Sequence, residues 1–458
     1  MTSAHTALPA PFVERIGRQM PDAASFIEAI GRPPHQSVRV NPAKSSRPPA
    51  DCTDAVPWCG GAWYVGSRPV YTLDPLFHAG HYYPQEASSM FIAHIISLVA
   101  DRLPHRPAVL DLCAAPGGKS TLLTSALGGE ATVVSNEIVR SRAWILRENI
   151  VKWGYTCNAV TCAEPSAFGQ MGPLFDVMLV DAPCSGEGMF RKDPAAIAEW
   201  SVDNAAQCAQ RQRRILADAW DALAEGGLLV YSTCTFNPDE NERNMEWLAA
   251  RAGVEFVDLH PDPSWGITPM PFDGGCGYAF HPHRARGEGF FVCAAFKTDG
   301  RPRITPSRSK KSRNAPRLSW PAHLVTAPEA FELCADADCL CAMPAESAQL
   351  MTHIAENVPT LLRGLPLGRP MRKEFVPDAA LALSTHFDPT AYPVAWLGRR
   401  EALGYLRGEW TAAVPTAQGW NAVGYEGALL GWVKVAGSRV NNYYPKEWRI
   451  RMQLPPDN

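Results

Sequence analysis

Short apolar runs alternate with longer amphipathic stretches from Pro107 to about residue 297. The runs predict strands at 108–113, 131–136, 157–161, 176–181 and 227–233. The stretches between and after them predict helices at 118–127, 140–153, 205–224 and 239–251. A later run, Phe290–Phe296, predicts a last strand that closes the domain. Because strands that alternate with helices form βαβ units, the pattern predicts an α/β fold with a parallel sheet covered on both faces.

The regions on either side of this alternation differ from it. Before it, a helical start over Pro11–Ile30 is followed by short segments. After it, residues 301–317 contain seven basic residues and no acidic one, which is typical of a linker or a solvated basic arm. From Pro321 onward the chain is rich in Gly, Pro, Trp and Tyr, and residues 431–435 (GWVKV) predict a strand.

These changes in composition and hydrophobic pattern predict five segments. They are an N-terminal extension over 1–103, an α/β domain over 104–300, a basic linker over 301–319, an intermediate domain over 320–390 and a last domain over 391–458.

Composition narrows the class of protein. Apolar residues make up 46% and charged residues 19% of the chain, which describes a globular protein with ample core. No apolar run reaches the ~18 residues of a membrane span, and the first residues lack a secretory signal. We therefore expect a cytoplasmic protein whose 13 cysteines are reduced, most of them packing the core. The net charge of −3 leaves nucleic acid open as a partner, because a local basic patch is sufficient.

Three predicted strands end in residues that can carry chemistry. The strand at 108–113 opens into a glycine-rich turn that runs to Lys119, and the strands at 176–181 and 227–233 precede Cys184 and Cys234. In an open α/β sheet, ligands bind outside the carboxyl ends of the strands. The sequence therefore predicts one crevice in which two thiols face a glycine-rich loop. The cysteines at 334, 339 and 341 lack the paired spacing of a zinc site, so we expect no metal.

The glycine-rich turn favours a cofactor without phosphates. The P-loop pattern needs a glycine at the position that Cys113 occupies, and the dinucleotide pattern G-x-G-x-x-G is absent. Glu137 follows the second predicted strand, where an acidic residue suits ribose hydroxyls. These features favour S-adenosylmethionine over a nucleoside triphosphate. A purely structural junction between strand and helix would give the same turn.

Two thiols beside a methyl donor match one specific reaction. Carbon C5 of cytosine becomes nucleophilic when a thiolate adds to C6, and an acid near N3 assists the addition. Asp181 ends its predicted strand close to Cys184, and Cys234 precedes a predicted helix start at Asn237 to Glu240, where a thiolate is favoured. A single cysteine after a strand is usually a core residue, but two such cysteines at one crevice favour covalent chemistry.

These residues together resemble the Sun-type (nucleolar-protein) family of RNA cytosine-C5 methyltransferases. The matching motifs are residues 113–119 (CAAPGGK), 181–188 (DAPCSGEG) and 231–235 (YSTCT), with two earlier segments at 39–41 and 85–90. The resemblance implies that Cys234 attacks C6, that Cys184 assists product release and that Asp181 contacts both cytosine and cofactor.

The same resemblance assigns the cofactor site. It implies that S-adenosyl-L-methionine is held by Cys113, Ala114, Ala115, Pro116, Gly117, Gly118, Lys119, Glu137 and Asp181. The family has an aspartate for adenine after the third strand, where this chain has Glu164, and we expect the longer side chain of Glu164 to reach the cofactor in its place. The implied fold is a Rossmann-like methyltransferase sheet with an N-terminal α+β extension for RNA.

The C-terminal part resembles the bacterial branch that modifies 16S ribosomal RNA. The matching segments are 364–368, 375–382 and 431–434, and in that branch the tail includes a PUA-like, β-rich RNA-binding domain. We therefore expect ribosomal RNA of the small subunit as partner, and neither membrane nor DNA. The same chemistry on transfer RNA or 23S ribosomal RNA, and a non-catalytic RNA-binding scaffold, are the alternatives. The expected RNA contacts are Arg39, Arg191, Lys192, Lys446 and Arg449.

Overall fold

A computed structural model describes residues 7–49, 51–67, 69–306, 320–336, 338–372, 374–410 and 416–454. Most of the predicted basic linker, from residue 307 to 319, lies outside these ranges. Among the described residues, no helix has both the length and the apolar character that a membrane crossing requires.

The N-terminal extension is two helices followed by a small antiparallel sheet. Helices α1 (Ala10–Gln19) and α2 (Ala23–Ile30) replace the single predicted helical start, because Pro21 interrupts the backbone hydrogen bonds between them. The sheet has the order β2-β3-β1-β4. Its strands are β1 (Gln36–Val40), β2 (Cys52–Ala55), β3 (Ala62–Val65) and β4 (Tyr82–Pro84). Helices α3 (Pro75–His78) and α4 (Ile92–Leu98) complete the region.

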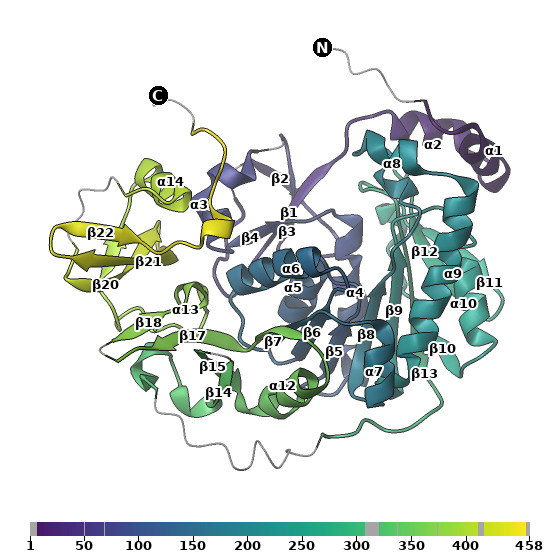
Figure 1. Cartoon of the computed structure of the whole chain (residues 1–458). Helices are drawn as coiled ribbons and strands as arrows, with labels where there is room; N and C mark the ends of the chain where they lie inside the picture. Colours follow the sequence, from purple (N-terminus) through teal and green to yellow (C-terminus); the bar gives the residue numbers. More distant parts are fainter. Residues whose placement is uncertain are drawn as a thin grey trace.

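The five predicted strands form the parallel centre of a ten-stranded sheet (Figure 1). Their order is β7-β6-β5-β8-β9, and neighbours are parallel throughout. The bounds are β5 (Ala108–Asp111), β6 (Thr132–Asn136), β7 (Asn158–Thr161), β8 (Phe175–Asp181) and β9 (Leu223–Thr233). The predicted Rossmann-like architecture is confirmed.

Helices cover both faces of this sheet, and alternate residues of each strand point into the two resulting cores. Val109 packs with α4 and α5, whereas its neighbour Leu110 packs with α7 and α9. The helices are α5 (Gly118–Ala126), α6 (Arg140–Trp153), α7 (Pro165–Met171), α9 (Val202–Ala219) and α10 (Glu242–Ala249). The predicted helix 205–224 is therefore too long, because its last two residues already belong to β9.

The sheet continues beyond the predicted strands at both edges. Strand β13 (Phe290–Lys297) runs antiparallel to β9 but does not close the sheet, since β12 (Gly275–Phe280) and β11 (Thr268–Phe272) follow it. The short strand β10 (Val254–Phe256) also pairs with β13. At the opposite edge, β16 (Thr360–Arg363) pairs antiparallel with β7. A segment from beyond the basic linker thus joins the central sheet.

Two further four-stranded sheets follow. The first contains β14 (Phe331–Asp336), β15 (Cys339–Pro344), β17 (Leu365–Pro370) and β18 (Phe375–Pro377), with helices α12 (Ala345–Asn357) and α13 (Ala379–Leu383). The second contains β19 (Val394–Trp396), β20 (Gly419–Tyr425), β21 (Ala428–Ala436) and β22 (Arg439–Asn442), with α14 (Arg399–Arg407). The predicted strand at 431–435 lies within β21.

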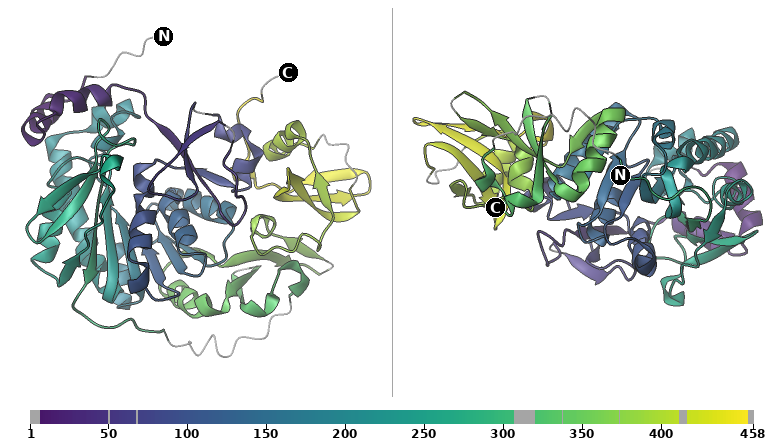
Figure 2. Two further views of the ribbon diagram at one scale, coloured as in Figure 1. Left: turned by 180° about the vertical axis from the view of Figure 1, so that it is seen from behind. Right: turned by 90° about the horizontal axis from the view of Figure 1, so that it is seen from below.

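The last sheet lies beside the part of the N-terminal extension that contains α3, whereas α1 and α2 lie on the opposite side of the molecule (Figure 1 and the left view of Figure 2). Leu403 and Tyr405 of α14 share an apolar cluster with Ala79, the residue that follows α3. The Tyr444 hydroxyl is 3.4 Å from Nδ1 of His78. The α3 region of the N-terminal extension therefore packs directly against the last sheet and α14.

Candidate active site

The two predicted thiols lie side by side at the carboxyl edge of the central sheet. Strands β8 and β9 are parallel neighbours, and Asp181 is paired in register with Ser232. The loops that follow these strands bring Sγ of Cys184 to 3.2 Å from Sγ of Cys234. The backbone N–H of Cys234 also donates to Sγ of Cys184, at 3.3 Å. Two half-buried thiols are thus in direct contact at the point where the strand pattern placed them.

The surroundings of Cys184 favour its protonated form. The hydrogen bond with Cys234 and burial both raise the pKa of the Cys184 thiol well above its usual range. A group that keeps its proton can donate it to the neighbouring sulfur. The pair is therefore suited to hold Cys184 as the thiol donor beside Cys234.

Asp181 and Lys119 form an ion pair between the first thiol and the glycine-rich turn. Lys119 Nζ lies 2.8 Å from Oδ2 of Asp181, while the Ser232 hydroxyl donates to Oδ1 at 2.8 Å. Burial opposes the charge of Lys119, but the Asp181 carboxylate outweighs it and raises the Lys119 pKa. The carboxylate side chain remains 32% exposed, so a ligand can reach it.

A cavity of about 210 Å³ opens between the glycine-rich turn and the N-terminal extension. Its walls include residues 113–116, 118 and 119 from the turn, Asp181 from β8, and residues 83–86 and 89 from the extension. Gly117 has a left-handed backbone, with φ of 114°, which favours glycine. A Cβ on Gly118 would come within 3.3 Å of the Tyr83 ring. The turn is thus shaped by close contact with the extension.

Two predicted acidic residues follow the next strands along the edge. Glu137, after β6, is 3% exposed; its Oε1 accepts from the backbone N–H of Val139, and its Oε2 lies 3.2 Å from Arg142 Nη1. Glu164, after β7, is exposed and immediately precedes α7. The structure therefore places both carboxylates on the same edge as the thiols and the turn.

Asp111, which sequence reasoning missed, lies fully buried beneath the turn. The Ser120 hydroxyl donates to its Oδ2 at 2.6 Å, and Oδ1 has no hydrogen-bond partner in the structure. Burial raises the Asp111 pKa from 3.8 to about 7, above its value in the unfolded chain. Raised in the folded state, this pKa contributes stability below about pH 4 that is lost as pH rises through about 7.

We expect Asp111→Asn to remove this loss. The amide oxygen still accepts from Ser120 but cannot ionise, so the variant should gain up to roughly 4 kcal/mol over the natural chain between about pH 4 and about pH 8. Urea unfolding across this range measures the difference, with Asp218→Asn, exposed on α9, as control. An Asp111→Asn chain whose free energy of unfolding follows the natural chain at every pH would contradict the assignment.

Glu240 is a second residue whose part in the site was missed, and the helix-capping role that the sequence predicted for it is wrong. The sequence indicated a capping box at Asn237 to Glu240, but α10 begins at Glu242 with Asn241 at its N-cap. Glu240 instead turns inward and accepts from the backbone N–H and the hydroxyl of Ser185, at 2.8 and 2.5 Å. Burial raises its pKa to about 7. Helix α10 thus begins after Asn241, whose side chain accepts from the Thr233 hydroxyl and donates to the Thr235 carbonyl, on either side of Cys234.

Two of the predicted RNA contacts are engaged inside the protein. Arg39 is 2% exposed, donates to Gln85 and Thr121 side chains at 3.0 and 2.6 Å, and stacks over the Trp153 ring at 4.5 Å. Arg191 lies 3.2 Å from the Glu288 carboxylate with 3% of its side chain exposed. These two guanidinium groups anchor the N-terminal extension and the loop after Cys184 and do not face solvent. Lys192 and Lys446 are exposed, and Arg449 is half-buried.

Comparisons with known proteins agree along nearly the whole chain. The model of the 16S rRNA methyltransferase RsmB/F family matches residues 102–297, that of the N-terminal domain of 16S rRNA methyltransferase RsmF matches residues 8–87, and that of the methyltransferase RsmF PUA domain matches residues 393–450. Ribosomal RNA small subunit methyltransferase F of Salmonella arizonae is 32% identical over an alignment of 472 residues, gaps included, which covers 96% of this chain and 96% of that one. The corresponding protein of Salmonella agona is 32% identical over 474 residues, again with 96% of either chain covered.

Solved structures share the fold of about two thirds of the chain. NSun6 from Pyrococcus horikoshii with SFG has a TM-score of 0.54 at 19% identity, covering 64% of this chain and 99% of that one. A methyltransferase homolog protein from Pyrococcus horikoshii has a TM-score of 0.51 at 25% identity, covering 63% of this chain and all of that one.

Proposed function

Because the chain belongs to the RsmB/F family of 16S ribosomal RNA methyltransferases, we propose that it methylates cytosine C5 in 16S ribosomal RNA through a covalent bond from Cys234. The methyl donor is S-adenosyl-L-methionine, the cofactor of this family. The observation that carries the chemistry is the pair of sulfurs 3.2 Å apart beside the Asp181–Lys119 ion pair. We place the reaction in the cytoplasm.

The residues around the turn fit this cofactor. It is a cation with a ribose and an amino-acid group, so it needs a carboxylate near its sulfonium and an acceptor for ribose hydroxyls. Asp181 lines the cavity of about 210 Å³, and Glu137 lies at the end of the neighbouring strand β6. Residues 113–119, Glu137, Glu164 and Asp181 would hold it. When bound, it supplies the electrophilic methyl group.

Each group at the thiol pair has a defined task. The Cys234 thiol loses its proton to solvent and its sulfur adds to C6 of the cytosine, so that the C5=C6 π bond opens and places electron density on C5. Asp181 contacts the N3 side of the ring, and the Lys119 ammonium 2.8 Å from it stabilises charge there. After methylation, the C5 proton is lost to solvent and the C6–S bond breaks. Cys184 donates a hydrogen bond to the departing sulfur.

RNA binding is assigned to groups that remain accessible. Lys192 follows the loop of Cys184 and would contact phosphate near the flipped cytosine. Lys446 and Arg449 follow β22 in the PUA domain, the part of the chain from about residue 391. The extension over 1–103 and the intermediate region over 320–390 would frame the catalytic domain between them.

A methylation assay tests the function. We expect the purified protein to transfer tritiated methyl groups from S-adenosylmethionine to 16S ribosomal RNA, as naked RNA or as 30S subunits, and bisulfite mapping to place them at cytosine C5. Incorporation confined to 23S ribosomal RNA or transfer RNA would overturn the substrate. RNA binding without any cofactor binding in equilibrium dialysis would instead indicate the scaffold.

A further inference from the structure

Two loops at the carboxyl edge of the central sheet carry the two thiols, and the first contains a short 3-10 helix at Glu187–Met189. We define the first thiol loop as residues 182–190, after β8, and the second thiol loop as residues 234–241, after β9. Their backbones meet at one point, where the N–H of Gly188 donates to the carbonyl of Cys234 at 2.7 Å. Because strand pairing ends before both loops, other contacts must set the separation of the two sulfurs.

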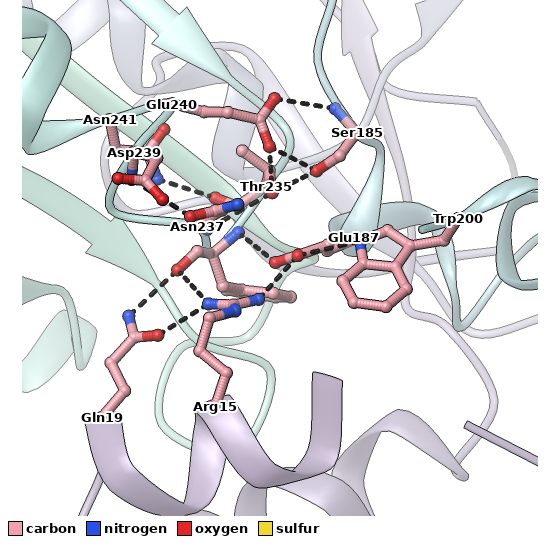
Figure 3. A network of polar contacts seen from close by, with 11 residues as sticks. Arg15, Gln19, Ser185, Glu187, Trp200, Thr235, Asn237, Asp239, Glu240 and Asn241 are labelled. Atoms are coloured by element: carbon pink, nitrogen blue, oxygen red, sulfur yellow. Dashed lines mark hydrogen bonds and ion pairs between the residues drawn. The ribbon is translucent and has the colours of Figure 1, made fainter. Parts of the chain in front are cut away.

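A fully buried carboxylate, Glu187, joins the two loops (Figure 3). It belongs to the first thiol loop, and its Oε2 accepts from the backbone N–H of Phe236 in the second, at 3.1 Å. Its Oε1 accepts from Trp200 Nε1 at 3.0 Å and from Arg15 Nη2 at 2.6 Å. A buried charge of this kind requires a charged partner, and Arg15 is that partner.

Arg15 reaches both loops from helix α1, which is far away in the sequence. Besides Glu187, it donates from Nη1 to the carbonyl of Phe236 at 3.2 Å. The Gln19 side chain, one turn later, accepts from Arg15 at 2.7 Å and donates to the same carbonyl at 3.0 Å. Figure 3 shows both side chains rising from the helix toward the second thiol loop. One guanidinium thus connects the two loops that hold the sulfurs.

Aromatic packing seats the same helix on the same loops. Phe12 of α1 is fully buried and lies edge-on to Phe190 of the first thiol loop, with ring centroids 5.1 Å apart. Phe26 of α2 lies edge-on to Phe236 of the second thiol loop at 4.8 Å. On the far side, Glu240 accepts from Ser185 and Gln212, which ties the loops a second time.

We propose that Arg15 is a positioning residue that fixes the separation of the Cys184 and Cys234 sulfurs, so that the N-terminal helix completes the thiol site. Its kinetic consequence rests on the proposed function, whereas its effect on the spacing of the sulfurs does not. An orientation error of about 1 Å at a reacting group can lower a rate ~100-fold. The extension therefore contributes to catalysis through the sulfurs, in addition to its place beside the cofactor turn.

The test compares Arg15→Met with Arg18→Met. Arg18 lies on the same helix, but 78% of its side chain is exposed and it pairs only with Glu14 among the described contacts. The first readout needs no RNA: diamide oxidises neighbouring thiols to a disulfide, and peptide mass mapping follows the bond between residues 184 and 234. We expect Arg15→Met to slow its formation at least about fivefold, because loosened loops lower the effective concentration of one thiol at the other.

The second readout is steady-state methylation. We expect kcat of Arg15→Met to fall about 10- to 100-fold with KM for S-adenosylmethionine within about twofold, since the cofactor turn does not touch Arg15. Arg18→Met should match the natural chain in both readouts. A natural chain that methylates none of the RNAs, combined with slowed disulfide formation in Arg15→Met, would end the proposed function and leave the spacing role standing.

A double variant controls for the Glu187 carboxylate, which Arg15→Met leaves buried without a charged partner. Arg15→Met combined with Glu187→Gln leaves no lone carboxylate in the site, so it should unfold cooperatively and bind cofactor, yet show the same slow disulfide formation. Natural rates of disulfide formation and of methylation in both Arg15 variants would overturn the proposal. So would loss of cooperative unfolding and of cofactor binding in both, because α1 would then hold the fold and not the sulfurs.

Discussion

Replacing Cys234 by serine is expected to abolish methylation, with kcat at least about a thousandfold lower than in the natural chain. A serine hydroxyl is far less acidic and less nucleophilic than a thiol, and among the described residues the hydrogen-bond partner of the side chain at position 234 is Cys184, which is not a base. The neighbouring Cys184 should not substitute, because burial still raises the pKa of its thiol in this variant. Tritiated methyl transfer to 16S ribosomal RNA measures the loss.

The controls separate chemistry from folding. Cys52→Ser alters a half-buried thiol in β2, in a different sheet, and should keep full activity. Cys234→Ser should still bind S-adenosylmethionine in equilibrium dialysis, because Cys234 does not line the cavity beside the turn. Methylation that survives in Cys234→Ser but disappears in Cys184→Ser would show that the nucleophile is the cysteine of the Pro-Cys motif, as in DNA cytosine enzymes.

The central sheet could be predicted because local signals there agree with the final fold. Helix α6 runs over the predicted residues, Arg140–Trp153, and ends at Gly154, whose φ of 87° stops the helix. The strand segments before Asp181 and Cys234, residues 177–180 and 227–231, are apolar runs in which every residue is buried, as expected for parallel strands. Because ligands bind at the carboxyl ends of the strands in such a sheet, the strand positions alone predicted that the two thiols lie together.

The missed residues depend on contacts between distant parts of the chain. Arg39 was interpreted as an RNA contact because its charge is visible in the sequence, whereas its partners Gln85, Thr121 and Trp153 lie far from it and from one another along the chain. Glu240 has the sequence spacing of a capping box. Its actual role depends on the hydrogen bond from the buried Ser185 hydroxyl, which the sequence does not show. A charged residue that folding buries carries no local mark in the sequence.

The edges of the sheet were missed for a related reason. Strand β16 is only four residues long, and its apolar residues do not distinguish a domain of its own from an edge strand of the central sheet. It pairs with β7, about 200 residues earlier in the chain. Neither strand carries a sequence signal for antiparallel pairing of this kind. The composition of residues 320–390 therefore predicted a separate domain.

The second large effect concerns release of the product. Cys184→Ala removes the thiol that lies 3.2 Å from Sγ of Cys234 and leaves the Asp181–Lys119 ion pair intact. Addition to C6 should still occur, but the departing sulfur loses its hydrogen-bond donor, and loss of a positioned proton donor lowers a rate about 100- to 10,000-fold. We therefore expect Cys184→Ala to accumulate a covalent complex with 16S ribosomal RNA, visible as a slower band on a denaturing gel.

The double variant Cys184→Ala, Cys234→Ser makes this result specific. It should bind RNA with unchanged affinity but form no band, because the bond to C6 requires the sulfur at position 234. A fluorinated cytosine, which has no proton to lose at C5, should trap the natural chain in the same band and so calibrate the gel. If Cys184→Ala binds RNA, turns over slowly and shows no covalent band, then Cys184 acts before the C6–S bond forms, and its raised pKa serves to activate Cys234 and not to release it.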